Sequence, residues 1–163
     1  VVAQSARDGL TDVRRSIKAL RPDALERSSL AEALEGMIGN FRLTTSAQIA
    51  YDQEAGKLNL DSDEEDALYR VVQEGLTNAV RHGRADRISV RVTRTGDLVT
   101  VSIRDNGTGC AKLEEGFGLR HMRERLNMLG GTLSYGNLDS DAQDGYTGFF
   151  ITVGLPIRNK KGE

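Results

Sequence analysis

The sequence predicts an α/β protein, because stretches with helical periodicity and stretches with strand alternation follow one another along the chain. Residues 68–82 space their apolar side chains as an amphipathic helix does. Residues 88–103 alternate apolar and polar side chains around a Gly96-Asp97 turn, as a β-hairpin does. With 38% hydrophobic and 28% charged residues among 163, the composition fits one soluble domain, or one domain with an appended element.

The first predicted helix covers residues 3–20 and carries a narrow apolar seam of heptad type. The seam consists of Ala3, Ala6, Leu10, Val13, Ile17 and Leu20. It is compatible with a surface helix of the same domain or with an arm that dimerises through a helical bundle. We favour the arm, because the seam is narrow and the chain begins without Met inside the pattern, as expected of a fragment. Arg21-Pro22 should end this helix, since proline restricts the residue before it.

A second helix and a strand follow. Ser28 or Ser29 is placed to cap the helix, and Glu32 would complete a capping box with Ser29. The strand is expected over residues 46–52, where apolar side chains alternate with polar ones.

The central helix is expected to run from a cap at Asp61 or Ser62 to Gly83, which is placed to end it. Its apolar face suits burial against a sheet. Its other face carries three polar side chains at positions i, i+4 and i+8, namely Glu74, Asn78 and His82.

The pattern of the C-terminal half predicts a hairpin, one helix and two further strands. In order, these are a hairpin over residues 87–104, a loop over 105–116, a helix over 118–129, and strands over 132–136 and 147–155. An acidic loop joins the last two strands.

Several classes of function are disfavoured by composition. The net charge of −2 gives no electrostatic case for nucleic-acid binding. The single cysteine, Cys110, cannot form an internal disulfide, which fits a reducing compartment. We find no signal peptide and no run of about 18 apolar residues, so no membrane span is expected in this stretch.

Three groups of residues match the needs of bound ATP. The carboxylate of Asp105, at a strand end, can accept a hydrogen bond from the adenine N6 amino group. The Asn78 amide oxygen can ligate Mg²⁺, a hard cation that prefers oxygen. Arg81 and His82 lie within reach of phosphate oxygens. Four glycines let backbone N–H groups approach phosphates closely: Gly107, Gly109, Gly116 and Gly118.

Each group alone is a weak signal, but their order and spacing resemble the sequence boxes of the Bergerat-fold ATPases, which include histidine kinases, gyrase-type and Hsp90-type proteins. The matching segments are Glu74-x3-Asn78-x3-His82 for the N box, Asp105-Asn106-Gly107-Thr108-Gly109 for the G1 box, and Gly116-Phe117-Gly118-Leu119 for the G2 box. The run from Gly118 to Leu126, with Leu129-Gly130-Gly131, further resembles sensor histidine kinases of the LiaS, VraS, DesK and NarX-like subfamily.

The resemblance implies a two-layer sandwich of a five-stranded mixed sheet and three helices, with an N-terminal helical dimerisation arm. Residues 1–27 would be the C-terminal part of the dimerisation and phosphotransfer domain, and residues 28–163 the catalytic ATP-binding domain. That domain would use ATP and Mg²⁺, belong in the cytoplasm, and serve a homodimeric protein that phosphorylates a response regulator.

The resemblance also implies individual roles. Asp105 would bind adenine N6, Asn78 would coordinate Mg²⁺, and Arg81 and His82 would contact phosphates. Glu74 would either polarise a metal-bound water or hold Asn78 in place. The nucleotide loops would be shaped by Gly107, Gly109, Gly116 and Gly118, and Leu119 would also contact the nucleotide.

Two features depart from the family pattern. The phospho-accepting histidine has no match, because the only histidines are His82 and His121. The Gly-Thr pair usual before the last strand has no clear counterpart in residues 145–148. The alternatives are an anti-sigma-type serine kinase and a non-catalytic ATP-binding regulatory module; neither explains the full set of motifs as well.

Overall fold

The computed structural model describes residues 21–157, so the predicted seam over residues 3–20 lies outside the described residues. The described helices are α2 (Asp23–Arg27), α3 (Leu30–Thr44), α4 (Ser62–Thr77), the π-helical turn η1 (Asn78–His82) and α5 (Phe117–Met128). The strands are β1 (Gln48–Gln53), β2 (Arg87–Thr95), β3 (Leu98–Asp105), β4 (Thr132–Asn137) and β5 (Phe149–Pro156). Among these residues, no helix is long and apolar enough to cross a membrane.

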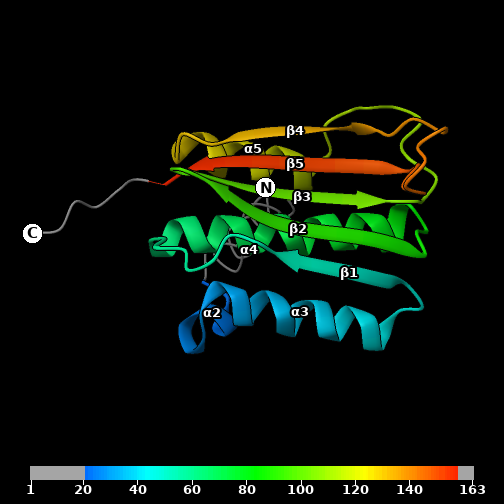
Figure 1. Cartoon of the computed structure of the whole chain (residues 1–163). Helices are drawn as coiled ribbons and strands as arrows, with labels where there is room; N and C mark the ends of the chain where they lie inside the picture. The colour runs from blue at the N-terminus through cyan, green and yellow to red at the C-terminus, as the bar shows by residue number, and fades with distance from the viewer. Residues whose placement is uncertain (1–20, 158–163) are drawn as a thin grey trace, which may run out of the picture.

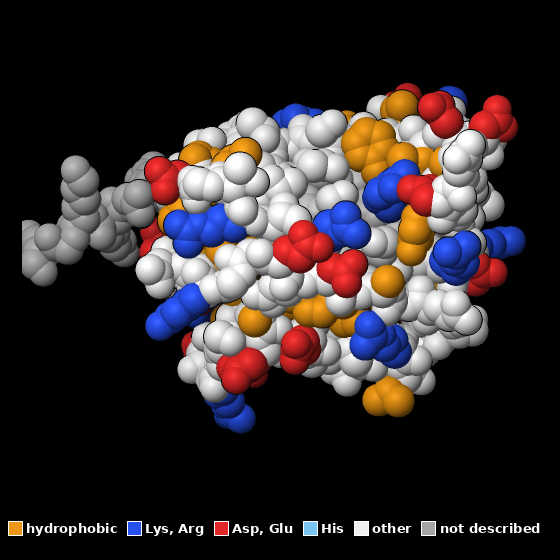
Figure 2. All heavy atoms as spheres, in the orientation of Figure 1, with side chains coloured by type: hydrophobic (Ala, Val, Ile, Leu, Met, Phe, Trp, Pro, Cys, Tyr) orange, Lys and Arg blue, Asp and Glu red, His pale blue; other side chains and the backbone are white. Residues whose placement is uncertain are grey.

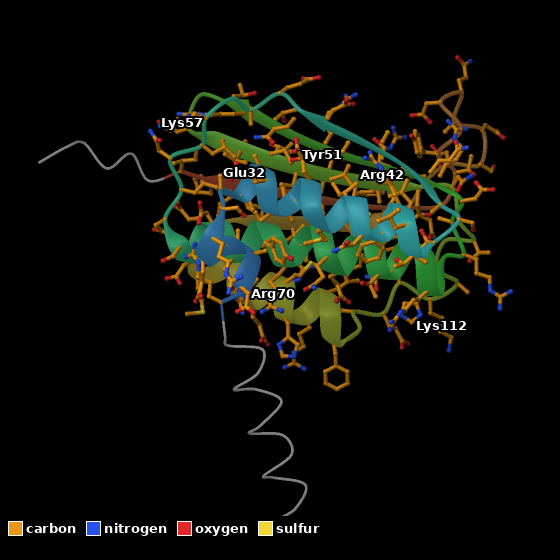
Figure 3. The ribbon with its side chains drawn as sticks, turned by 90° about the horizontal axis from the view of Figure 1, so that it is seen from below. Glu32, Arg42, Tyr51, Lys57, Arg70 and Lys112 are labelled. Atoms are coloured by element: carbon orange, nitrogen blue, oxygen red, sulfur yellow. The ribbon has the colours of Figure 1, made fainter. Side chains whose placement is uncertain are left out.

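The five strands form one mixed sheet in the order β1-β2-β3-β5-β4 (Figure 1). β1 runs parallel to β2, and the remaining neighbours are antiparallel. Helices α3, α4 and α5 cover one face, as the view from below shows (Figure 3). The predicted two-layer fold is therefore confirmed, and the short helix α2 is an addition that the sequence analysis did not predict.

The core lies between the helices and the inner face of the sheet. Along β2, the buried Ile88, Val90 and Val92 alternate with residues that face the other side. Figure 2 shows that other, outer face, which carries scattered charged and polar side chains. Leu25 of α2 is also buried in this core, and the proposed domain boundary after residue 27 stays a prediction.

Both predicted helix starts are confirmed. The Ser29 side chain accepts from the Glu32 N–H, and the Glu32 side chain accepts from the Ser29 N–H. Of the two candidates for the central helix, Asp61 is the cap, and it forms a second capping box with Glu64. Each box satisfies N–H groups that the first turn of a helix leaves unpaired.

The central helix differs from the prediction at its end. A continuous α-helix was expected to His82, but α4 ends at Thr77 and the π-helical turn η1 follows. The Gly83 N–H donates to the Asn78 carbonyl, five residues back, at 2.9 Å. A π turn widens the helix, so Asn78 and His82 do not continue an even α-helical row from Glu74.

Candidate functional site

A pocket of about 290 Å³ lies between the end of α4, η1, the ends of β3 and β5, and the segment that leads into α5. Most of the predicted site residues line it: Glu74, Asn78, His82, Asp105, Gly109, Gly116, Gly118 and Leu119. Two predicted residues, Arg81 and Gly107, are not on its wall. Arg81 is exposed on η1, and the Gly107 N–H donates a hydrogen bond to the Asp105 carboxylate.

Asp105 is the last residue of β3, and only 5% of it is exposed. Its Oδ1 accepts from the Gly107 N–H at 2.8 Å and from the Phe149 N–H at 3.1 Å. Burial raises the pKa of the Asp105 carboxyl above its ordinary value of 3.8, while the two N–H groups oppose the shift. Since both backbone bonds within the described residues go to Oδ1, Oδ2 is the oxygen that can accept from a ligand.

Gly148 makes this arrangement of Asp105 feasible, and the sequence analysis missed its role. A side chain at position 148 would overlap the Asp105 carboxylate and the Gly107 backbone. The Gly148 N–H also donates to the Asp105 carbonyl at 2.9 Å. Gly148 directly precedes β5. The available signal was a glycine inside the strand predicted over residues 147–155, where glycine often marks the close approach of another backbone.

A second close approach joins the N-box and G1 segments. A side chain at Gly107 would overlap the Gly83 carbonyl, and the Thr108 N–H donates to that carbonyl at 2.8 Å. The end of η1 is therefore held against the loop after β3. This contact brings Asn78 to the same pocket as Asp105.

Asn137, at the end of β4, binds the backbone of Cys110 in the loop after β3, and this role was not predicted. Its Oδ1 accepts from the Cys110 N–H at 2.7 Å, and its Nδ2 donates to the Cys110 carbonyl at 2.8 Å. Gly109 beside it has φ +68°, a conformation that favours glycine. In Figure 1 the loop after β3 and the loop between β4 and β5 lie at the same end of the sheet.

The opposite end of the pocket is formed by the start of α5. Gly116 occupies the N-cap position and offers no side-chain cap, so N–H groups of the first turn are open to a ligand. The Glu74 carboxylate lies so close to Gly118 that a side chain there would overlap it. Leu119 is buried and forms part of the apolar wall.

The donor set fits Mg²⁺ that enters together with a nucleotide. Asn78 is half-buried on the pocket wall, and the Glu74 carboxylate lies on the same wall. Within residues 21–157, no group of three or more His, Cys, Asp or Glu side chains could hold a metal ion. Mg²⁺ usually takes one or two protein oxygens and completes its shell with phosphates and water, which this pocket allows.

Comparisons with known proteins agree with this geometry. Residues 63–159 match the family described as histidine kinase-, DNA gyrase B- and HSP90-like ATPase. The chain is 33% identical over 160 residues to the sensor histidine kinase LnrJ of Bacillus subtilis, covering 96% of this chain and 37% of that protein. It is also 33% identical to the histidine-protein kinase/phosphatase UhpB of Salmonella typhimurium, covering 75% of this chain and 25% of that protein. The chain thus spans well under half the length of these relatives.

Solved structures support the fold. The histidine kinase domain of the Erythrobacter litoralis EL346 blue-light activated kinase superposes with a TM-score of 0.62 at 20% identity, covering 78% of this chain and 61% of that one. The mycobacterial sensor histidine kinase MprB gives a TM-score of 0.58 at 22% identity, covering 79% and 96%. The chain therefore belongs to the histidine kinase-, DNA gyrase B- and HSP90-like ATPase family, and its sequence relatives place it among the ATP-binding catalytic domains of sensor histidine kinases.

Proposed function

We propose that this chain binds Mg-ATP and presents the γ-phosphoryl group to a histidine on a helical segment outside residues 21–157. From that histidine the phosphoryl group passes to an aspartate on a response regulator. The observation that carries the proposal is the single pocket that brings together Asp105, Asn78, Glu74 and the glycine-rich start of α5.

Asp105 selects adenine in this proposal. Its free Oδ2 accepts from the N6 amino group, whereas the oxo group of guanine offers no donor. A buried carboxylate left without its partner costs about 1–3 kcal/mol, which gives the site its preference for ATP.

Asn78 and Glu74 act at the phosphate end. The Asn78 amide oxygen holds Mg²⁺, which neutralises phosphate charge when it is bound. Glu74 either orients a metal-bound water or keeps Asn78 in place. Arg81 and His82 contact phosphate oxygens, and the open N–H groups at the start of α5 add a favourable dipole.

Neither described histidine is placed to accept the phosphoryl group. His82 is built into η1 on the pocket wall, and His121 lies on α5 away from that wall, with Glu124 Oε2 at 3.7 Å from its Nδ1. Phosphoryl transfer depends on positioning an acceptor in line with the γ-phosphate, and it is helped by an adjacent base. Gly83 and Met122 directly follow the two histidines, so neither histidine is followed by an acid, and the Glu124 carboxylate beside His121 lies outside the pocket as His121 does.

The test uses radiolabelled ATP. The chain alone should stay unlabelled, but it should place an acid-labile label on the added dimerisation helices of a related sensor kinase. The Asp105→Asn variant serves as the matched control and should transfer far less label. Acid-labile label mapped to His82 or His121 would contradict the proposal.

The same experiment separates the alternative functions. Acid-stable label on a serine of an added protein would indicate the anti-sigma-type kinase. ATP binding by calorimetry with no transfer to the added helices would indicate a non-catalytic module. Homodimerisation through residues 3–20 and a cytoplasmic location follow from the proposal, and light scattering before and after removal of residues 1–20 tests the former.

A further inference from the structure

The loop between β4 and β5, residues 138–148, turns back over the outer face of the sheet. Its Tyr146 ring lies against two guanidinium groups, with the Arg87 Cζ at 5.3 Å and the Arg104 Cζ at 5.6 Å from the ring centroid. Both distances are within the range of cation–π attraction. Because Arg104 alternates with the buried Ile103 and Asp105, its side chain belongs to the outer face.

Asp144 completes this contact. Its Oδ2 accepts from Nη1 of Arg104 at 2.5 Å, and its Oδ1 accepts from the Tyr146 N–H at 3.1 Å. These interactions, the Tyr146 N–H first and Arg104 second, hold the pKa of the Asp144 carboxyl below its ordinary value. We call Asp144, Tyr146, Arg87 and Arg104 the Tyr146 clamp.

The two arginines of the clamp come from positions on either side of the adenine-binding carboxylate. Arg104 directly precedes Asp105 in β3. Arg87 exchanges two hydrogen bonds with Asn106, which directly follows Asp105: the Arg87 N–H donates to the side-chain Oδ1 of Asn106 at 2.9 Å, and the Asn106 N–H donates to the Arg87 carbonyl at 3.1 Å. One clamp arginine is therefore the chain neighbour of Asp105 on one side, and the other is bonded through its backbone to the chain neighbour on the other side.

The same loop also reaches Asp105 from the pocket side. Two and three residues beyond Tyr146, Gly148 and Phe149 donate N–H bonds to the carbonyl and the carboxylate of Asp105. Gly145, with φ +77°, turns the chain between Asp144 and Tyr146. A movement of Tyr146 would thus be transmitted to the donors that orient the carboxylate.

We propose that the Tyr146 clamp is a positioning device that fixes the direction of the Asp105 carboxylate and so sets the preference for adenine over guanine. Hydrogen bonds weaken steeply when their angle departs from linearity, so a small rotation of Asp105 lowers adenine affinity. Tyr146 and Asp144 are positioning residues, since they act through Asp105. The proposal rests on the proposed function, in which Asp105 accepts from adenine N6.

The experiment measures ATP and GTP affinities by calorimetry on the full 163-residue chain. Tyr146→Ala should weaken ATP about three- to tenfold while GTP affinity stays unchanged, so the ATP-to-GTP ratio falls. Tyr146→Phe keeps the ring over both arginines and should retain the ratio. A uniform loss of both affinities would show a merely structural role and would overturn the proposal.

A second pair of variants guards against misfolding of Tyr146→Ala. Asp144→Asn removes the ion pair with Arg104 and should lower the ratio to a smaller extent, about twofold. Asp139→Asn removes the same charge from the same exposed loop, outside the clamp, and should change nothing. Equal ratios in these two variants would overturn the clamp.

The Asp105→Asn variant, measured in the same way, distinguishes a failure of the clamp proposal from a failure of the proposed function. If Asp105→Asn lowers the ATP-to-GTP ratio and the clamp variants do not, the clamp is wrong and the proposed function stands. If Asp105→Asn itself leaves the ratio unchanged, the adenine assignment of the proposed function is wrong.

Discussion

The end of the pocket that we propose for adenine and the end that we propose for the phosphates are built differently. At the adenine end, Asp105, Gly107 and Gly148 are held by backbone contacts so close that only glycine fits at two of the three positions. At the phosphate end, Arg81 is exposed, and Phe117 at the start of α5 is 82% exposed.

The difference shows which part of recognition the folded chain supplies by itself. Orienting one buried carboxylate requires fixed backbone donors, so the adenine end is complete before a ligand arrives. Phosphates and Mg²⁺ bring their own charges and bound water. The phosphate end therefore needs only exposed basic side chains and unpaired backbone N–H groups. Substitutions that add bulk at Gly107 or Gly148 should therefore affect folding and affinity together, and those at the exposed residues of the phosphate end affinity alone.

The largest effect is expected for Gly148→Ala. The added methyl group would overlap Asp105, and relieving such an overlap costs about 1–3 kcal/mol of stability. We expect ATP affinity to fall about 100-fold, because the carboxylate must rotate away. Thermal unfolding and calorimetry on the same sample measure both losses.

Gly116→Ala is the matched substitution at the phosphate end. A methyl group there meets nothing within 4 Å, and Gly116 has an ordinary φ of −71°. Its melting temperature should stay at or slightly above that of the parent chain. Equal destabilisation by the two substitutions would refute the contrast between the ends.

The next effect concerns the charge of Asp105. Asp105→Asn should weaken ATP about tenfold, since the amide is a poorer acceptor and its N–H₂ group can face the adenine donor. Because burial raises the carboxyl pKa above 3.8, adenosine affinity of the parent chain should fall as pH drops toward that raised pKa. The Asn variant has no carboxyl here and gives the baseline, which includes any titration of adenine itself.

The same raised pKa fixes the sign of the stability change. The protonated carboxyl favours the folded state fully below pH 3.8, and this contribution is lost as pH rises through the raised folded-state pKa. At neutral pH the charged, buried Asp105 therefore opposes folding. Asp105→Asn should melt no lower than the parent chain, and a clear drop in its melting temperature would contradict this account.

Features that depend on residues close to one another in sequence were predicted correctly. The capping box at Ser29, the helix cap at Asp61 and the 87–104 hairpin each depend on residues close in sequence, and the structure contains all three. The three family boxes are also local in sequence, and residues of each line one pocket. Such patterns report hydrogen bonds and periodicity within a single element.

The unpredicted features depend on contacts between distant segments. Gly148 is required by Asp105, which lies 43 residues earlier, and Asn137 by the backbone of Cys110. The π turn at Asn78 was not predicted, because helical periodicity indicates a continuous helix and does not reveal a single π turn inside it. Packing between distant segments determines such features, and the local pattern of a single sequence does not reveal that packing.

A smaller effect is expected for metal binding at Asn78. Asn78→Ala removes the ligand oxygen from the pocket wall, so ATP affinity should become nearly equal with and without Mg²⁺, a loss of roughly fivefold in its presence. Adenosine affinity and melting temperature should stay unchanged, because the adenine end is untouched. If the difference between ATP with and without Mg²⁺ persists, Asn78 has a structural role instead.

The smallest effect is expected for Arg81→Gln. Arg81 is exposed on η1 and does not line the pocket, so its guanidinium reaches a phosphate only through solvent-screened contact. Exposed charge pairs contribute about 0–1 kcal/mol, so ATP affinity should fall only about twofold, and less at high salt. Adenosine affinity and stability should not change, since the Arg81 side chain is exposed.

Calorimetry with ATP and adenosine at two salt concentrations measures these affinities. A loss in ATP affinity as large as that of Asp105→Asn, or any loss in adenosine affinity, would mean that the phosphate end is as fixed before binding as the adenine end.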